Sequence, residues 1–243
     1  EGRIEWEVCD GAFLYLAPDD IMMENSAFEN RQCNFPLNHY HGITITISVS
    51  ELQNEMTDLL RFFSIDSENL EQHFELNAHP FIMHKASAIK HLAHEMYDIT
   101  ESIRMEYLRI KVIEMLVILR TIDAVKFGED RPYFYRTQVD KIKAIMALIT
   151  ENLDEHFTMN DLSARFDISV SALKQCFKGV YGTAIYTYIR NYRMDMAATL
   201  LTQTDEPITT NAGKVGYSNS SKFSQAFKSI KGKSPLEYRK ITT

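Results

Sequence analysis

The sequence has few of the residues that mark secreted or membrane-bound proteins. It has three cysteines in 243 residues, they lie far apart, and no Cys-x-x-Cys pair occurs. Neither a disulfide framework nor a thiolate zinc site is therefore expected, and reduced cysteines favour a cytoplasmic location. No apolar run reaches the roughly 18 residues of a membrane helix, so no membrane partner is expected. No signal peptide is present. Because the chain begins Glu-Gly-Arg without an initial methionine, we expect a fragment that lacks part of its first domain.

Charge is divided unevenly along a chain that is long enough for two domains. The whole sequence carries a net charge of −7, yet residues 140–243 have 14 Lys and Arg against 10 Asp and Glu. The remaining residues have 12 Lys and Arg against 23 Asp and Glu. From Lys214 onward there are seven cations and one acid, Glu237. A solvated surface explains a small imbalance. The run of cations better fits a basic nucleic-acid reader attached to an acidic domain.

One local pattern occurs twice in the last hundred residues. The first copy has Ser169, Leu173, Phe177, Lys178, Gly182 and Tyr188, and adding 50 gives Asn219, Phe223, Phe227, Lys228, Gly232 and Tyr238. Upstream the offset is 49, which pairs Ser163, Phe166, Asp167 and Ile168 with Ala212, Val215, Gly216 and Tyr217. A repeat with a one-residue slip indicates two copies of one supersecondary unit. Each copy predicts a short helix, a turn, a second helix and a glycine end.

The residues of the first copy support this prediction. Thr158 and Asp161 have the spacing of a capping box at a helix start. Ser169 suits the N-cap of the second helix. Leu173 and Phe177 then share one face at i, i+4, and Gly182 ends the helix.

The outward positions of both second helices are polar. They are Ser171, Lys174, Gln175 and Lys178 in the first copy, and Ser220, Ser221, Lys222, Ser224, Gln225 and Lys228 in the second. Hydroxyls, amides and lysines bind base edges and phosphates. In a single copy, the polar face of such a helix would more simply be a solvated surface. Its occurrence in both copies favours a DNA-reading surface. Residues 183–202 carry a long apolar stripe that predicts a helix between the copies.

At this point the chain resembles the AraC family of bacterial transcription regulators. The resemblance covers residues 140–240 and rests on motifs with fixed spacing. They are Ser169-x-x-x-Leu173-x-x-x-Phe177-Lys178, Tyr188-x-x-x-x-Arg193-x-x-x-Ala197-x-x-Leu200-Leu201, Gly216-Tyr217-Ser218, Phe223-x-x-x-Phe227-Lys228 and Ser234-Pro235-x-x-Tyr238-Arg239. It implies an all-α domain of seven helices, with helix-turn-helix units at 158–182 and 207–232 joined by the 183–202 helix. Each recognition helix would enter one of two successive major grooves.

The resemblance also assigns roles and partners. It implies double-stranded DNA and RNA polymerase as partners and no cofactor, and an activator is the regulatory type that we expect. Base contacts would come from Ser171, Lys174, Gln175, Ser220, Ser221, Ser224 and Gln225, and phosphate contacts from Lys178, Arg190, Lys222 and Lys228.

One position departs from the family pattern. Asn211 stands where the family has an apolar residue, and Gly213 follows inside the same expected helix. A mid-helix glycine costs about 0.5–1 kcal/mol relative to alanine, and a buried unpaired amide costs about 1–3 kcal/mol more. The second unit is therefore expected to be soft unless Asn211 finds a partner.

The first domain, residues 1–127, is expected to be α+β. Alternation predicts a strand near residues 4–8, and apolar segments suggest further strands at 12–16, 21–23 and 81–83, with a turn at Asp19-Asp20. The clearest alternation is Ile43, Ile45, Ile47 and Val49, followed by a helix from Ser50. Regulators of this family often have a cupin-like barrel followed by helices, and this segment resembles part of such a sheet.

Histidines suggest a site in the first domain. His39 and His41 would lie on one side of a strand, the arrangement that cupin enzymes use for metal, but no further ligand has suitable spacing. We therefore expect no metal, and His84, His91 and His94 more simply form a solvated or partly packed helix face. Trp6, Tyr15, His39 and His41 are candidates for binding a small organic effector.

The expected helix at 101–124 carries two apolar stripes. One contains Ile103, Tyr107, Ile110 and Val117, and the other contains Met105, Leu108, Val112, Met115, Leu119 and Ile122. Two faces imply two partners, so we predict a homodimer through the second stripe, with a fully buried helix as the alternative. Residues 128–139 are expected to be a linker.

The sequence thus predicts a transcription regulator, not an enzyme, with an N-terminal domain that senses an effector and dimerises. One alternative is a first domain that only dimerises or binds a protein. Another is a metal-dependent cupin-type enzyme fused to a DNA-binding module.

Overall fold

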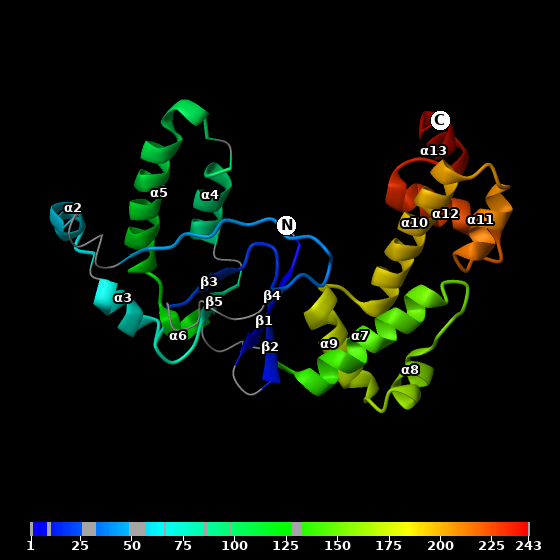
Figure 1. Cartoon of the computed structure of the whole chain (residues 1–243), viewed down its shortest axis with the longest axis horizontal. Coiled ribbons are helices and arrows are strands. Elements are labelled where there is room, and N and C mark those ends of the chain that lie inside the picture. The colour runs from blue at the N-terminus through cyan, green and yellow to red at the C-terminus, as the bar shows by residue number, and fades with distance from the viewer. Residues whose placement is uncertain are drawn as a thin grey trace. The chain divides into compact units, whose positions relative to one another are not determined.

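The computed structural model describes residues 2–8, 11–25, 33–48, 57–65, 67–84, 87–97, 99–127 and 133–242. The chain divides into two compact units, residues 1–133 and 134–243 (Figure 1). Among the described residues, no helix combines the length and the apolar character needed to span a bilayer.

The first unit contains short antiparallel strands. Strand β1 (Ile4–Val8) pairs with β2 (Ala12–Leu16), so that Ile4 lies opposite Leu16, and also with β4 (Cys33–Asn34). Strand β3 (Ile21–Met23) pairs with β5 (Phe81–Met83). Four of these strands lie where the sequence predicted them, and Asp19 forms the expected turn with a φ of 70°. The cupin-like character of the sheet stays a prediction.

The alternating segment at 43–49 is not a strand over its described residues, 43–48. Ile43 is 37% exposed, while Ile47 packs against the core of this unit. Alternation is not enough, because a strand also needs a partner whose backbone groups accept and donate its hydrogen bonds. Val49 and the expected helix start at Ser50 lie outside the described residues.

Short helices complete the first unit. They are α2 (Thr57–Phe62), α3 (Ser67–His73), α4 (Ser87–Glu95), the 3-10 helix η3 (Glu101–Ile103), α5 (Arg104–Leu119) and α6 (Ala124–Phe127). The single helix predicted at 101–124 is therefore wrong at both ends. At its C-terminal end the chain turns, because the Thr121 amide and hydroxyl both donate to the Ile118 carbonyl. Phe74, Phe81, Met83 and the end of α5 form the core.

The described residues of the second unit form seven helices, the number implied by the family resemblance. After β6 (Phe134–Tyr135) come α7 (Arg136–Glu151), α8 (Met159–Arg165), α9 (Val170–Tyr181), α10 (Ile185–Gln203), α11 (Ile208–Lys214), α12 (Ser220–Lys231) and α13 (Pro235–Thr242). Helix α7 begins inside the segment expected to be a linker, because Val139 already belongs to its buried stripe.

Asn211 lies in α11, fully buried, and its amide has partners. With Nδ2 turned toward Glu206, it donates to Glu206 Oε2 at 3.1 Å and accepts from Arg239 Nη2 at 3.1 Å. Arg239 also donates to the Glu206 backbone carbonyl at 2.7 Å, and Lys214 pairs with Glu206 Oε2 at 2.6 Å. The second helix-turn-helix unit is therefore not softened by an unpaired amide.

We expect Asn211→Leu to destabilise the protein, although leucine is the residue at the equivalent position of the first copy, Leu162. The change leaves polar groups of Glu206 and Arg239 without the amide, which costs about 1–3 kcal/mol. Urea denaturation measures the loss in the free energy of unfolding. Asn191→Leu, on the exposed face of α10, is the matched control and should stay within about 0.5 kcal/mol of the parent. Equal stability of both variants would contradict a stabilising role for the network.

Candidate nucleic-acid interface

The first helix-turn-helix unit is built from local capping interactions. Thr158 and Asp161 form a reciprocal capping box at the start of α8, and hydrogen bonds from Thr158 lower the pKa of the Asp161 carboxyl. Asp167 turns the chain with a φ of 46°. The Ser169 hydroxyl then accepts from the Ala172 amide at 3.2 Å, so that α9 begins there. Gly182, with a φ of 79°, ends it.

The second helix-turn-helix unit repeats this geometry at the predicted offsets. Gly216 takes the place of Asp167 with a φ of 81°. The Asn219 side chain caps α12 by accepting from the Lys222 amide at 3.0 Å, and Gly232 ends the helix with a φ of 76°. Helices α9 and α12 have the same length, 12 residues. Unlike the first unit, the second begins at Pro207 without a side-chain cap.

Each of these helices has a buried apolar face and an exposed polar face. Leu173, Phe177, Phe223 and Phe227 are fully buried. Burial also raises the pKa of the Cys176 thiol on α9 to about 12, so the thiol is protonated at neutral pH. Almost all predicted base-contacting side chains are exposed: Ser171, Lys174, Gln175, Ser220, Ser221 and Gln225. Ser224 is half-buried, which makes it the least accessible of the set.

Cations differ in whether they are already paired. Lys141, Lys214 and Lys231 pair with acids inside the second unit. Among the described residues, by contrast, no acid pairs with the exposed side chains predicted to hold phosphate, and Glu237 comes within electrostatic range of one of them, Lys228. The predicted phosphate contacts are Lys178, Arg190, Lys222 and Lys228.

The structure does not bring the four candidate effector residues together. Tyr15 lies opposite Glu5 across the β1–β2 pair, and Trp6 lies opposite Leu14. Because neighbouring residues of a strand point to opposite faces, Trp6 and Tyr15 occupy different sides of the sheet. Trp6 packs with the apolar cluster around Ile4. His39 and His41 are exposed on a segment that is not a strand, and His41 lies against Tyr97.

Sequence reasoning missed a buried carboxylate in the same sheet. Glu5, which alternates with the apolar residues of β1, is fully buried. The Tyr15 hydroxyl donates to its Oε2 at 2.5 Å, and Asn34 Nδ2 donates to its Oε1 at 3.1 Å. Among the described residues, no three His, Cys, Asp or Glu side chains converge in a way that could hold a metal ion.

The predicted dimer stripe on α5 divides along its length. Leu119 is 5% exposed and belongs to the core of its own unit, and Val112 and Met115 pack against that core. Leu119 was therefore wrongly assigned to a dimer contact. The side chain of Met105, near the start of α5, is 61% exposed, and Leu108 is half-buried. On another face of the helix Ile110 is 59% exposed.

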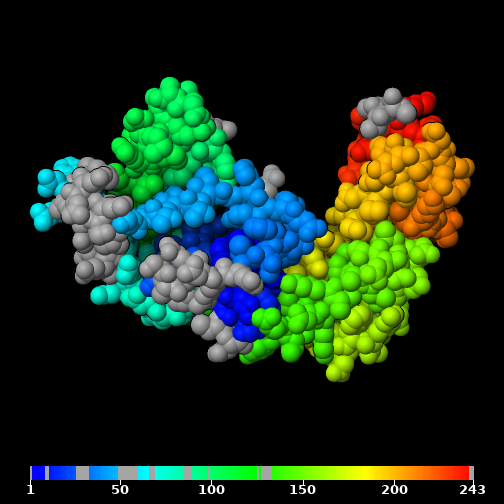
Figure 2. Space-filling view, viewed as in Figure 1, coloured from blue at the N-terminus to red at the C-terminus, as the bar shows by residue number. Residues whose placement is uncertain are grey.

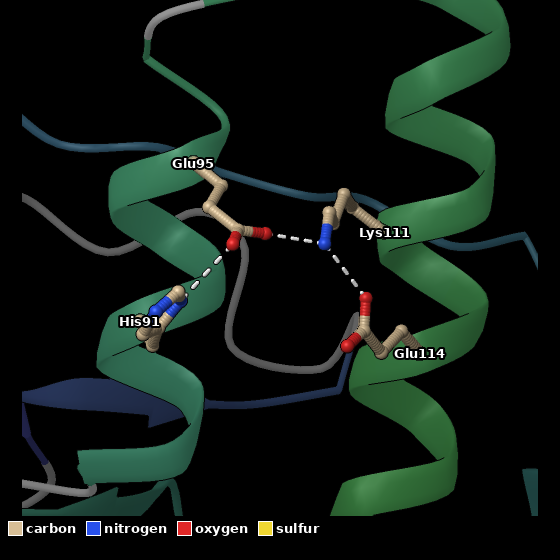
Figure 3. A network of polar contacts seen from close by, with 4 residues as sticks. All are labelled: His91, Glu95, Lys111 and Glu114. Carbon is tan, nitrogen blue, oxygen red and sulfur yellow. Dashed lines mark hydrogen bonds and ion pairs between the residues drawn. The ribbon is translucent and has the colours of Figure 1, made fainter.

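A polar network joins α4 to α5 (Figure 3). Lys111, whose side chain is 11% exposed, lies between Glu95 of α4 and Glu114 of its own helix. Hydrogen bonds to Glu114 and Glu95 raise the pKa of Lys111, so it stays charged. His91 Nδ1 lies 3.2 Å from Glu95 Oε1. The i, i+3 spacing of Lys111 and Glu114 was the available sequence signal, since Glu114 interrupts an apolar stripe.

Comparison with known proteins supports the reading of the second unit. A family model described as a helix-turn-helix domain matches residues 162–241. The HTH-type transcriptional activator RhaR of Mannheimia succiniciproducens is 28% identical over 124 residues, which are 51% of this chain and 44% of that protein. The melibiose operon regulatory protein of Escherichia coli is 29% identical over 42% of this chain and 33% of its own length. The matched segments thus span less than half of these relatives.

Among solved structures, a transcriptional regulator from Chromobacterium violaceum, described as containing an AraC-type DNA-binding domain, is 25% identical. The match covers 43% of this chain and 93% of that one, with a TM-score of 0.40. The family match falls on the segment that carries the repeated capped helices. Residues 162–241 thus form a helix-turn-helix domain of AraC type, and the chain is similar to transcription regulators.

Proposed function

We propose that this protein is a regulator of transcription that binds a specific sequence of double-stranded DNA through both of its helix-turn-helix units. The observation that carries the proposal is the pair of equal helices, α9 and α12, each with a buried apolar face and an exposed face of hydroxyls, amides and lysines. A helix of this kind fits the major groove.

The connecting helix has a length that suits two neighbouring grooves. Helix α10 has 19 residues, which correspond to about 28 Å at 1.5 Å per residue. One turn of B-DNA is about 34 Å, so recognition helices held near opposite ends of α10 can reach successive major grooves. The net positive charge of residues 140–243 favours the approach to phosphate.

Roles follow from the chemistry of the exposed side chains. Gln175 and Gln225 each offer a donor and an acceptor, which can hold adenine through two hydrogen bonds. Lys178 and Lys228 directly follow the buried phenylalanines and are proposed to hold phosphate, together with Arg190 and Lys222. Phosphate contacts position the protein, and base contacts specify the sequence.

We expect Gln175→Ala and Lys228→Ala to affect binding in different ways. The target is first obtained by selecting bound sequences from random DNA. Gln175→Ala should then relax the preference at one or two base pairs by about 1–3 kcal/mol and leave the salt slope unchanged. Lys228→Ala should weaken binding to all sequences alike and lower the salt slope by about one unit. Titrations of labelled duplexes at several salt concentrations measure both effects.

Matched controls are Gln203→Ala, at the exposed end of α10, and Lys126→Ala, in the first unit. Neither should change the selected sequence or the salt slope. Equal losses on specific and random DNA for Gln175→Ala would show that another face of α9 reads the bases. Failure of the unmodified protein to enrich any sequence would contradict the function itself.

We further propose that the first unit senses a small-molecule effector, and that the regulator acts as an activator that contacts RNA polymerase. Support for sensing comes from the buried Glu5 carboxylate and its hydrogen bonds, because an ionisable group inside a small sheet carries a desolvation cost that structure alone does not require. A first unit that only dimerises or binds a protein is the alternative.

Melting temperatures of the full chain with a panel of small metabolites distinguish these alternatives. A true effector at 100-fold its dissociation constant should add about 2.7 kcal/mol to the free energy of unfolding. Glu5→Gln should reduce that gain if Glu5 belongs to the effector site, whereas Glu106→Gln, on the exposed surface of α5, should not. A panel without any stabilising compound would favour the alternative.

The homodimer is also a proposal, and we relocate its contact to the exposed part of α5. Met105 and Ile110 lie on different faces of α5 and are both more than half exposed, so Met105→Lys combined with Ile110→Lys should give a folded monomer whichever of these faces makes the contact. Leu119→Lys should instead unfold the first unit, because a buried lysine without a partner is strongly disfavoured. Sedimentation velocity and circular dichroism measure the two outcomes. A dimer that persists in the folded double variant would place the interface outside α5.

A further inference from the structure

We propose that Arg193 is a positioning residue that fixes the two helix-turn-helix units at one separation and one rotation, and thereby restricts binding to half-sites of one spacing. The inference rests on the proposed DNA-binding function. Arg193 lies in α10, between the units, and its side chain is half-buried.

On one side Arg193 contacts the first helix-turn-helix unit. Its Nη2 atom donates to the Glu155 carbonyl at 2.7 Å and lies 3.4 Å from His156 Nδ1. Both residues belong to the loop that leads from α7 into α8. Because the bond is to a backbone carbonyl, it fixes the path of the loop and not only the direction of one side chain.

On the other side Arg193 contacts the turn of the second helix-turn-helix unit. A Cβ atom on Gly216 would lie 2.8 Å from Arg193 Cζ and 2.6 Å from the Leu153 carbonyl oxygen. The backbone of this turn therefore packs against both the guanidinium group and the loop of the first unit. Figure 2 shows the green surface around the end of α7 directly against the orange surface of the second unit.

The two turns differ in a way that fits this contact. Asp167, the equivalent residue in the first unit, also has a positive φ, yet its exposed side chain reaches toward Lys141. A side chain at position 216 would have no such space. A left-handed backbone alone therefore does not explain the glycine, since the first unit accommodates a side chain at the same position. The close approach of the loop before the first helix-turn-helix unit does explain why the residue is a glycine.

The guanidinium is kept between the units at an energetic cost. Burial lowers the pKa of Arg193, while Tyr217 and Asp154 raise it. Its Nε atom is buried without a hydrogen-bond partner in the described part of the chain. A planar group with several fixed donors is suited to joining two backbone segments, and lysine offers no such plane.

A rigid link should make binding depend on half-site spacing. One inserted base pair moves the second groove by about 3.4 Å and rotates it about the DNA axis. We expect the unmodified full chain to lose about tenfold in affinity when one base pair is inserted between the selected half-sites. Arg193→Met and Arg193→Lys should reduce this loss to about threefold or less, while the mismatch penalties within each half-site stay unchanged.

Two glycine variants provide a matched pair. Gly216→Ala and Gly232→Ala both place alanine at a φ near 80°, but a Cβ on Gly232 meets no atom within 4 Å. Backbone strain is thus common to both variants, and the clash with the first unit belongs to Gly216→Ala alone. Gly216→Ala should flatten the dependence on spacing, and Gly232→Ala should retain it.

A distance measurement without DNA separates this inference from the function on which it rests. Spin labels at positions 174 and 225, in a chain with Cys9 and Cys33 replaced by serine, report the separation of α9 and α12. The parent should give a narrow distance distribution, and Arg193→Lys and Gly216→Ala should give broader ones than Gly232→Ala. If Arg193→Met fails to fold, the comparison of the two glycine variants decides.

The proposal is overturned if folded Arg193→Lys and Gly216→Ala keep both the narrow distribution and the parental dependence on spacing. A broadened distribution in a protein that enriches no DNA sequence would support the positioning role and contradict the proposed function. Loss of sequence preference within a half-site, with spacing dependence retained, would show that Arg193 acts on the recognition helices themselves and would also overturn the proposal.

Discussion

One residue in the left-handed backbone conformation determines how each recognition helix is presented. Asp167 and Gly216 end the first helix of their units and redirect the chain within two or three residues. The next helix can then bury its two aromatic or aliphatic anchors against the unit while its opposite face stays in solvent. Without this turn, the apolar and polar faces of α9 and α12 would have no fixed orientation relative to α10.

The charges of the second unit fall into two groups with different consequences. Lysines such as Lys214 and Lys231 are paired with acids on neighbouring elements, so their charge is used in tertiary contacts. The lysines on the outward faces of α9 and α12 have no such pairing among the described residues. Their charge is therefore available to an anionic partner, and binding would not require the loss of an existing ion pair. This division links the folding of the domain to its proposed function.

Local signals predicted most of the second unit, and contacts between distant residues account for what was missed. The capping box, the N-caps and the glycine ends each act within a few residues, and the repeat showed the N-caps and the glycine ends twice. The exposed recognition faces followed from the same periodicity. By contrast, the partners of Asn211 include Arg239 on another helix, and the contact of Gly216 with Leu153 joins the two helix-turn-helix units. No spacing in the sequence identifies such pairs.

The first unit was harder to predict because its elements depend on partners that lie far along the chain. The β1–β2 pairing joins neighbouring segments and was predicted correctly, whereas the alternation at 43–48 forms no strand. Glu5 alternates as an exposed residue would, yet Tyr15 and Asn34 supply its hydrogen bonds inside the sheet. On α5, apolar periodicity could not separate the residues that face the unit's own core from those that remain exposed. In this unit, therefore, periodicity indicated where elements form, and side-chain partners determined which of their faces is buried.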